Sequence, residues 1–177
     1  MGDDPSQFKG PERPVEQVDR AQANEFIGRL NALLPGLDAR LPTEAQWEHA
    51  CRAGTQTPFW FGDQIKPEQV NYDGDYPYTG GAKGLYREQT VEVKALPCNA
   101  WGLYQMHGNV WEWCQDWYGD YHSNLIEDPT GPETGEECVV RGGGWFYLAG
   151  YCRSALRGHW APSLRSGWLG FRLARGP

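Results

Sequence analysis

Two residue types in this sequence could carry redox or metal chemistry: cysteine and histidine. The five cysteines are Cys51, Cys98, Cys114, Cys138 and Cys152. Because their number is odd and no C-x-x-C pair occurs, they predict neither a full disulfide framework nor a zinc cluster. We expect free thiols, most of them buried, in a reducing compartment.

The histidines do not suggest a metal site either. They are His49, His107, His122 and His159. Their separations do not match the short spacings that are typical of metal ligands. We therefore expect each of the four to lie at the surface or in a loop.

The charge of the chain limits the classes of partner. The net charge is −7 and no basic stripe occurs, so the sequence predicts no nucleic-acid partner. No apolar run approaches the length of a membrane-spanning helix, and residues 1–5 lack the features of a secretory signal. Taken as it stands, the sequence indicates a cytoplasmic protein; display at a cell surface would require a signal that has been removed.

Two helices are expected near the start of the chain, where they can position a site. Residues 1–17 are polar and contain three prolines, which predicts extended coil. Apolar residues at helical spacing predict a helix over residues 19–34, and a Pro-Gly pair follows it. A second helix is expected over residues 43–54, because Thr43 and Gln46 have the spacing of a capping box.

Beyond the second helix the sequence predicts little regular structure. Residues 55–100 alternate aromatic residues with turn formers, and strand patterns occur only at 109–118, 138–145 and 170–174. The chain combines 23 glycines and 13 prolines with nine tryptophans. This composition is typical of a fold rich in loops that pack on large rings.

Three motifs resemble the signatures of the formylglycine-generating-enzyme (sulfatase-modifying factor) family. Residues 40–48 read RLPTEAQWE, and residues 99–113 read NAWGLYQMHGNVWEW. The C-terminal part contains RGGGW at 141–145, CRSA at 152–155 and GFR at 170–172. The resemblance implies an α+β, C-type-lectin-like fold with low regular secondary structure and two N-terminal helices.

The same resemblance covers nearly the whole chain. It implies that residues 1–177 form a single domain, from which the N-terminal part of the family's domain is missing. Five tryptophans lie in or beside the motifs, and we expect all of them to pack in the core. They are Trp47, Trp101, Trp111, Trp113 and Trp117.

The resemblance also bears on catalysis. Enzymatic members of the family oxidise a cysteine of a client sulfatase, using reactive thiols whose copper(I) chemistry needs a soft thiolate. The position that corresponds to one reactive cysteine is Tyr147, its partner cysteine has no match, and Cys152 corresponds to a structural cysteine. Another branch holds iron with three histidines, mostly on an extra helical domain that has no counterpart here. We therefore predict that the chain is not an enzyme and takes no copper.

Calcium is the one cofactor that the resemblance favours. The implied ligands are the side chain of Gln105, the carbonyls of Gly108 and Val110, and Glu112, all of which are hard oxygen donors around a glycine turn. The alternative is that Glu112 pairs with an arginine such as Arg172. A second family site would use residues 71 and 72, but Leu85 stands where its acid is needed.

We predict that residues 141–174 form a variable ligand-binding segment. A frame of glycine, arginine and aromatic residues encloses residues without periodicity, and irregular loops on a rigid frame are where binding sites usually lie. Their types include those that antibody paratopes favour. The predicted contact residues are Phe146, Tyr147, Leu148, Gly150, Tyr151, Leu156, Gly158, His159, Ser163, Leu164, Ser166, Gly167 and Trp168.

This segment is similar to that of variable proteins from diversity-generating retroelements. Mutation of the adenines in Asn codons can produce every contact residue except Trp168. We therefore predict a non-catalytic binding protein whose partner is a protein or another macromolecule bound through residues 146–168. Two alternatives stay open: an ordinary non-catalytic family member, or a degenerate or divergent formylglycine-generating-type oxidoreductase. The expected anchors, as exposed rings, are Phe146, Tyr147, Tyr151, His159 and Trp168.

Overall fold

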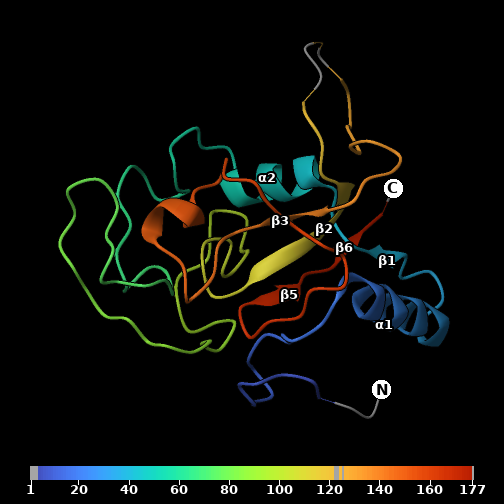
Figure 1. The fold of residues 1–177 in the computed structure, drawn as a ribbon, viewed down its shortest axis with the longest axis horizontal. Helices are drawn as coiled ribbons and strands as arrows, with labels where there is room; N and C mark the ends of the chain where they lie inside the picture. The colour runs from blue at the N-terminus through green and yellow to red at the C-terminus, as the bar shows by residue number, and fades with distance from the viewer. Residues whose placement is uncertain (1–3, 122–123, 125, 177) are drawn as a thin grey trace.

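Two helices in the first third of the chain are the longest regular elements of the fold. The computed structural model describes residues 4–121, 124 and 126–176. Within these ranges, α1 spans Arg20–Leu33 and α2 spans Glu44–Arg52, and Figure 1 shows them on different sides of a small sheet. Neither is long and apolar enough to cross a membrane. The prediction of two N-terminal helices is confirmed.

Both helices begin at a capping box, in which two side chains satisfy two backbone N–H groups that have no partner within the helix. At α2, the Thr43 side chain accepts a hydrogen bond from the Gln46 N–H at 3.2 Å, and Gln46 Oε1 accepts one from the Thr43 N–H at 3.1 Å. The predicted cap is therefore present. At α1, Asp19 and Gln22 make the same pair of bonds, at 2.9 and 3.2 Å.

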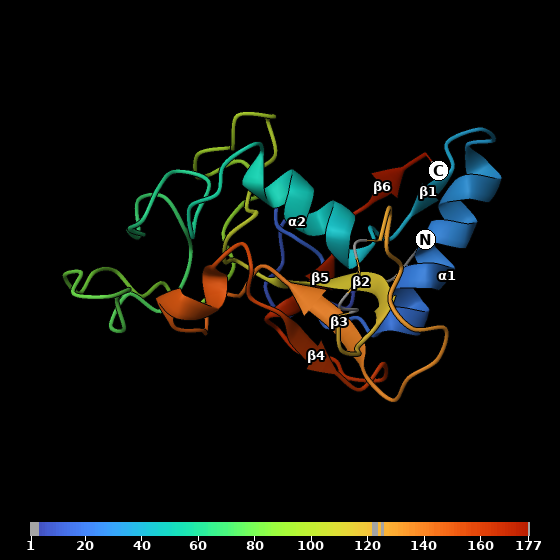
Figure 2. The ribbon, with the colours of Figure 1, turned by 90° about the horizontal axis from the view of Figure 1, so that it is seen from above.

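The sheet has four strands in the order β4-β3-β2-β5. Its central strands are β2 (Trp111–Trp117) and β3 (Cys138–Arg141), which run antiparallel. The outer strands are β4 (Gly158–Trp160), antiparallel to β3, and β5 (Leu169–Phe171), parallel to β2. In Figure 2 the helix α2 lies over this sheet, while α1 lies beside it.

The strand predicted at residues 170–174 is wrong as a single element. Its first part, β5, belongs to the four-stranded sheet, whereas β6 (Ala174–Arg175) pairs antiparallel with β1 (Ala39–Arg40) in a separate two-stranded sheet. The chain changes sheets at Arg172. The guanidinium of this residue is bonded to Glu112 on β2, at the point where the chain leaves the four-stranded sheet.

Long loops make up the part of the chain between α2 and β2, as the sequence predicts. Residues 55–100 contain no helix or strand among the named elements, and isolated bridges connect them to later parts of the chain. Asn71 pairs with Gly108, and Asp73 pairs with Leu148. Figures 1 and 2 both show the resulting green loops beside the short 3₁₀ helix η1 (Ala149–Cys152).

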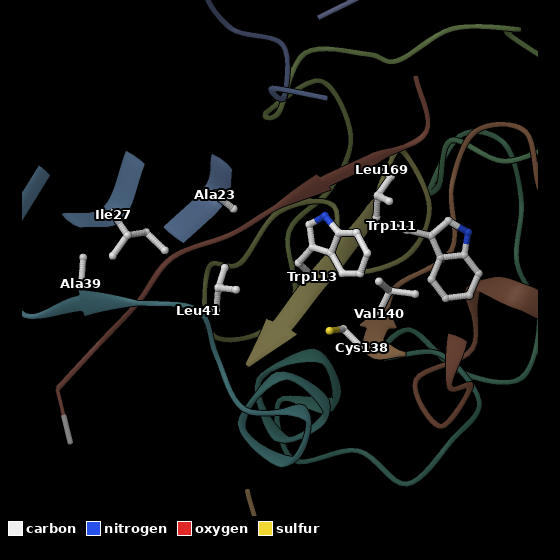
Figure 3. Packing of buried hydrophobic residues seen from close by; sticks show 9 residues of the cluster. All are labelled: Ala23, Ile27, Ala39, Leu41, Trp111, Trp113, Cys138, Val140 and Leu169. Atoms are coloured by element: carbon white, nitrogen blue, oxygen red, sulfur yellow. The ribbon is translucent and has the colours of Figure 1, made fainter. Parts of the chain in front are cut away.

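The main core lies between α1, the sheet and β1. Figure 3 shows the rings of Trp113 and Trp111 from β2, with Leu169 from β5 and Val140 from β3 around them. Ile27 on α1 closes the same cluster. Because β2 is buried on both faces, side chains from both of its faces pack in the interior. The strand therefore does not alternate between buried apolar and exposed polar residues.

Four of the five motif tryptophans pack inside, but Trp101 does not. Its side chain is 51% exposed and touches His49 edge-on, with ring centroids 5.0 Å apart. The buried residue of this turn is instead Asn99, whose side-chain oxygen accepts hydrogen bonds from the N–H groups of Trp101 and Leu103, both at 3.0 Å. The expectation of a core role for Trp101 is wrong, because the polar side chain holds the turn and the ring projects outward.

A buried carboxylate connects three elements at the centre of the fold. Glu112 on β2 accepts a hydrogen bond from Trp47 Nε1 on α2 at 2.6 Å. Arg172 donates to the two oxygens of Glu112 at 2.6 and 2.7 Å, and it also donates to the Tyr104 carbonyl at 3.0 Å. The predicted alternative, a Glu112–Arg172 ion pair, is confirmed.

Replacing Arg172 by methionine should destabilise the domain by about 3–5 kcal/mol, because it leaves a buried carboxylate without its cation. Urea unfolding followed by tryptophan fluorescence measures this loss. Arg175→Met is the matched control, since Arg175 is exposed and its loss should cost under about 0.5 kcal/mol. Equal effects of the two substitutions would contradict the assigned role of the ion pair.

Candidate ligand-binding surface

The loops of the C-terminal segment, some of them exposed and others half-buried, rest on a buried polar frame. Arg141, which is completely buried, donates hydrogen bonds to the carbonyls of Ser154 and Leu156 and forms an ion pair with Glu48. Backbone carbonyls buried in a loop need donors, and a guanidinium can supply several at once. One side chain on β3 thus fixes the path of the chain after η1.

Of the three glycines after Arg141, Gly143 is required by close packing. Gly143 has φ +77°, and a Cβ atom there would lie 2.7 Å from Cys152 Sγ. A side chain at this position would therefore push η1 away from the sheet. The glycine brings the two ends of the loop 143–152 into contact and shapes the surface above them.

His107 supports η1 from below. Its Nδ1 lies 2.7 Å from the Cys152 carbonyl oxygen, and its Nε2 accepts a hydrogen bond from the Trp60 N–H at 3.1 Å. Burial lowers the pKa of His107 to about 4, which keeps the ring neutral as this pair of bonds requires.

His107 lies in a loop, as expected, but its side chain is almost completely buried, because it packs against Cys152 of η1 and bonds to the Trp60 N–H. His49 and His159 are exposed as expected, and His122 lies outside the described residues. The sequence signal for a buried role was the position of His107 within the GLYQMHGN motif.

Five of the predicted contact residues project into solvent, as a binding role requires. Three of them are large apolar side chains, and exposed apolar residues that gather in one area often mark an interaction site. The exposed five are Phe146, Leu148, Tyr151, His159 and Ser163. His159 also stacks on Tyr118 at 4.0 Å and contacts Glu137, so a neighbouring loop holds its orientation.

Other predicted contact residues are half-buried rather than free. Leu156, Leu164 and Trp168 pack against the main core, as does Tyr147. Ser166 is also half-buried, and its carbonyl accepts a hydrogen bond from the Gln17 N–H at 3.0 Å. These side chains present only part of their surface to a ligand and stabilise the domain with the rest.

Tyr147 is at the centre of a group of aromatic rings. Its ring lies 5.4 Å from Trp111, 5.2 Å from Trp168 and 5.6 Å from Tyr151, all in edge-to-face arrangements. Burial raises the pKa of Tyr147 to about 12, so its phenol is neutral at physiological pH. The expectation of a freely exposed ring is therefore wrong for Tyr147, which is a packing residue with one accessible face.

The three predicted contact glycines differ in how much room surrounds them. A Cβ atom on Gly158 would lie 2.8 Å from Val140 Cγ2, and one on Gly167 would lie 2.5 Å from Gln7 Oε1. Nothing lies within 4 Å of a Cβ atom on Gly150. Only Gly150 could carry a side chain without rearrangement, and any ligand contact at the other two glycines would be through the backbone.

The sequence gives no indication that residues 75–79 lie beside the C-terminal segment. These residues and the C-terminal segment line one open groove of about 590 Å³. The aromatic pattern of this region was visible in the sequence, but nothing in it indicated proximity to η1. The contact arises through the tertiary fold, in which the Asp73 N–H donates to the Tyr147 carbonyl at 3.0 Å.

The thiols have the environment of structural cysteines. All five are free, and four of them are buried, which confirms the expected state. Burial raises the pKa of Cys51 to about 12 and also raises the pKa values of Cys114, Cys138 and Cys152. A thiol that stays protonated is a poor nucleophile and a poor copper ligand.

The expected calcium ligands are not equivalent in the structure. Gln105 Oε1 is buried and has no hydrogen-bond partner, so this hard oxygen is available to a cation. Both oxygens of Glu112 are instead engaged by Arg172 and Trp47. Across the described ranges, no three histidine, cysteine, aspartate or glutamate side chains are grouped as a metal site. A calcium ion here would depend mainly on amide and carbonyl oxygens.

The fold and the surface together define a C-type-lectin-like α+β domain, in which a small sheet and two helices carry long loops. Two solved structures are similar to it over almost the whole chain. Treponema denticola variable protein 1 has a TM-score of 0.80 and 31% identity, covering 100% of this chain and 79% of that one. PvdO from Pseudomonas aeruginosa has a TM-score of 0.78 and 31% identity, covering 95% and 64%.

The sequence profile of the Sulfatase-modifying factor enzyme 1-like domain matches residues 1–177, and the chain belongs to this family. The formylglycine-generating enzyme of Bos taurus is 38% identical over 144 residues, which are 76% of this chain and 38% of the enzyme. The Streptomyces coelicolor enzyme is 39% identical over 145 residues, or 76% and 46%. The chain thus spans less than half the length of these relatives. The predicted family and fold are confirmed.

Proposed function

We propose that this protein binds a macromolecular ligand without catalysis and is a variable protein of a diversity-generating retroelement. One observation carries the proposal: exposed side chains of the C-terminal segment alternate with completely buried residues that hold the backbone. Arg141, Cys152 and Ser154 are completely buried, whereas Phe146 and Tyr151 between them are about half exposed. Similarity to Treponema denticola variable protein 1 along the entire chain supports the proposal.

The C-terminal segment lacks the chemistry that a thiol oxidase would need. Tyr147 stands where the family resemblance implies a reactive cysteine, and a phenol, whose pKa burial raises further to about 12, supplies no thiolate. Cys152, the last residue of η1, is completely buried, and burial raises the pKa of its thiol. Neither group can supply an accessible thiolate at neutral pH. The relatives' enzymatic activity is therefore not part of the proposed function.

Incubation with a sulfatase-motif peptide, copper and oxygen should leave the cysteine of the peptide unmodified. The formylglycine-generating enzyme of Streptomyces coelicolor serves as the positive control under the same conditions. Mass spectrometry of the peptide distinguishes the two outcomes, because conversion of cysteine to formylglycine changes its mass. Conversion by this protein above the level of a heat-denatured sample would refute the non-catalytic assignment and favour the divergent oxidoreductase.

The gene should carry the marks of targeted diversification. We expect a reverse-transcriptase gene beside it, together with a near-copy of the DNA that encodes residues 141–174. Differences between the copies should fall at adenines of the template and should change exposed positions such as Leu148 and Tyr151. Sequencing the locus checks this directly. A locus with neither feature would leave an ordinary non-catalytic family member as the better assignment.

We also propose that one calcium ion binds at Gln105, Gly108, Val110 and Glu112. The unpaired buried oxygen of Gln105 supports this site. The ion would have to share Glu112 with Arg172, whose positive charge opposes it. A bound ion would hold the 105–112 turn against β2 and would stabilise the folded state by mass action.

A chelator should therefore lower the melting temperature of the protein and should leave that of Gln105→Leu unchanged. Gln115→Leu is the matched control, because Gln115 is an exposed glutamine on β2 outside the ligand set, and it should respond like the parent. Unfolding and refolding the protein in chelator removes a slowly exchanging ion before the measurement. A parent protein that melts identically after this treatment, with and without added calcium, contains no such site.

A further inference from the structure

We infer that residues 75–79 form the second wall of the ligand site and select a protruding protein loop that offers a basic side chain beside an apolar or aromatic one. The inference rests on the proposed function and adds a part of the site that lies outside the C-terminal segment. The groove between the two segments has a volume of about 590 Å³, which is in the range of ligand-binding sites.

The two walls of the groove are connected by backbone hydrogen bonds. Asp73 pairs with Leu148, and the Ala149 N–H donates to the Tyr76 carbonyl at 3.3 Å. Gly74 holds the base of the 75–79 loop, since a Cβ atom there would lie 2.5 Å from the Leu85 carbonyl oxygen. The loop is therefore held against η1, and a ligand that contacts η1 meets both walls.

Aromatic and apolar side chains line the groove from both sides. Tyr76, Pro77 and Tyr78 come from the loop, and Leu148 and Tyr151 come from the C-terminal segment. Tyr76 is 56% exposed and Tyr151 is 43% exposed, so both offer ring surface to a ligand. Tyrosine contributes a large contact area at a low entropic cost, and its ring face attracts cations.

The charged groups of the groove indicate what else the ligand must carry. Asp75 has an exposed carboxylate whose nearest cation, Lys83, is itself exposed and 3.7 Å away. Such a pair is weak and can be exchanged for a basic side chain of the ligand. On the opposite wall, Arg153 uses Nε to bind the Gly150 carbonyl at 3.0 Å. Its other donors can reach backbone carbonyls of a bound loop, as a guanidinium has five.

Gly150 provides a way to close the groove without disturbing the fold. It lines the groove, and a Cβ atom there would meet nothing within 4 Å. Gly150→Trp should therefore fill the space between the walls and leave the melting temperature unchanged. Gly28→Trp is the matched control, because Gly28 is an exposed glycine on α1 with equally open surroundings, far from the groove.

The test is a selection from a phage library of disulfide-constrained peptide loops on the full protein, followed by affinity measurement of selected peptides by fluorescence polarisation. We expect enrichment of lysine or arginine next to an aromatic or aliphatic residue. Selected peptides should lose at least about tenfold in affinity with Gly150→Trp, Tyr76→Ala and Tyr151→Ala, as anchor residues do. Gly28→Trp should bind like the parent. Selection on Asp75→Lys should favour acidic loops instead.

The outcomes separate this inference from the proposed function. If Tyr151→Ala weakens binding but Tyr76→Ala and Asp75→Lys change neither affinity nor selected sequence, the C-terminal surface binds alone and the second wall is refuted. If selected peptides bind all the variants equally, the C-terminal surface itself is refuted. Failure to enrich any loop, or enrichment of acidic loops on the parent, also overturns the inference.

Discussion

The fold depends on a buried ion pair that connects elements far apart in the sequence. Glu112 is held by Arg172 from the junction of β5 and β6 and by Trp47 from α2. A buried carboxylate is costly unless its charge is paired and its lone pairs are satisfied. This requirement forces α2, β2 and the C-terminal end of the chain into one arrangement. The sheet then has a fixed position from which the loops extend.

A second buried cation, Arg141, holds the loops in place, as the Glu112–Arg172 pair holds the sheet. Arg141 donates to two carbonyls of the C-terminal segment and pairs with Glu48 on α2. The path of residues 154–156 is thereby set by a side chain on β3. When buried hydrogen-bond donors hold the backbone of a loop, the shape of the loop does not require particular side chains at its exposed positions. Sequence change at Leu148 or Tyr151 therefore leaves the main determinants of the fold in place.

The sequence predicts local elements well, because local interactions produce them. The Thr43–Gln46 cap, the helix over residues 19–34 and the strand near Trp111 follow from spacing alone. The Glu112–Arg172 pair could be named only as an alternative, since nothing local distinguishes it from a calcium ligand. The core position predicted for Trp101 is wrong for a related reason. The motif shows that an aromatic residue belongs at this position but not in which direction its side chain points.

The candidate ligand-binding surface depends on contacts between distant segments, which the sequence alone does not reveal. Five exposed residues of the C-terminal segment could be predicted, because irregular sequence between frame positions indicates a loop, but the same pattern did not separate them from the half-buried residues of that loop. Tyr147 could not be assigned to the packed group, because its neighbours Trp111 and Trp168 come from other strands and loops. The loop at 75–79 could not be assigned to the surface either, because bridges between residues about 75 positions apart bring it there. A groove built in this way takes its two walls from distant parts of the chain, so substitutions at exposed positions of the C-terminal segment can change one wall while the loop at 75–79 stays in place.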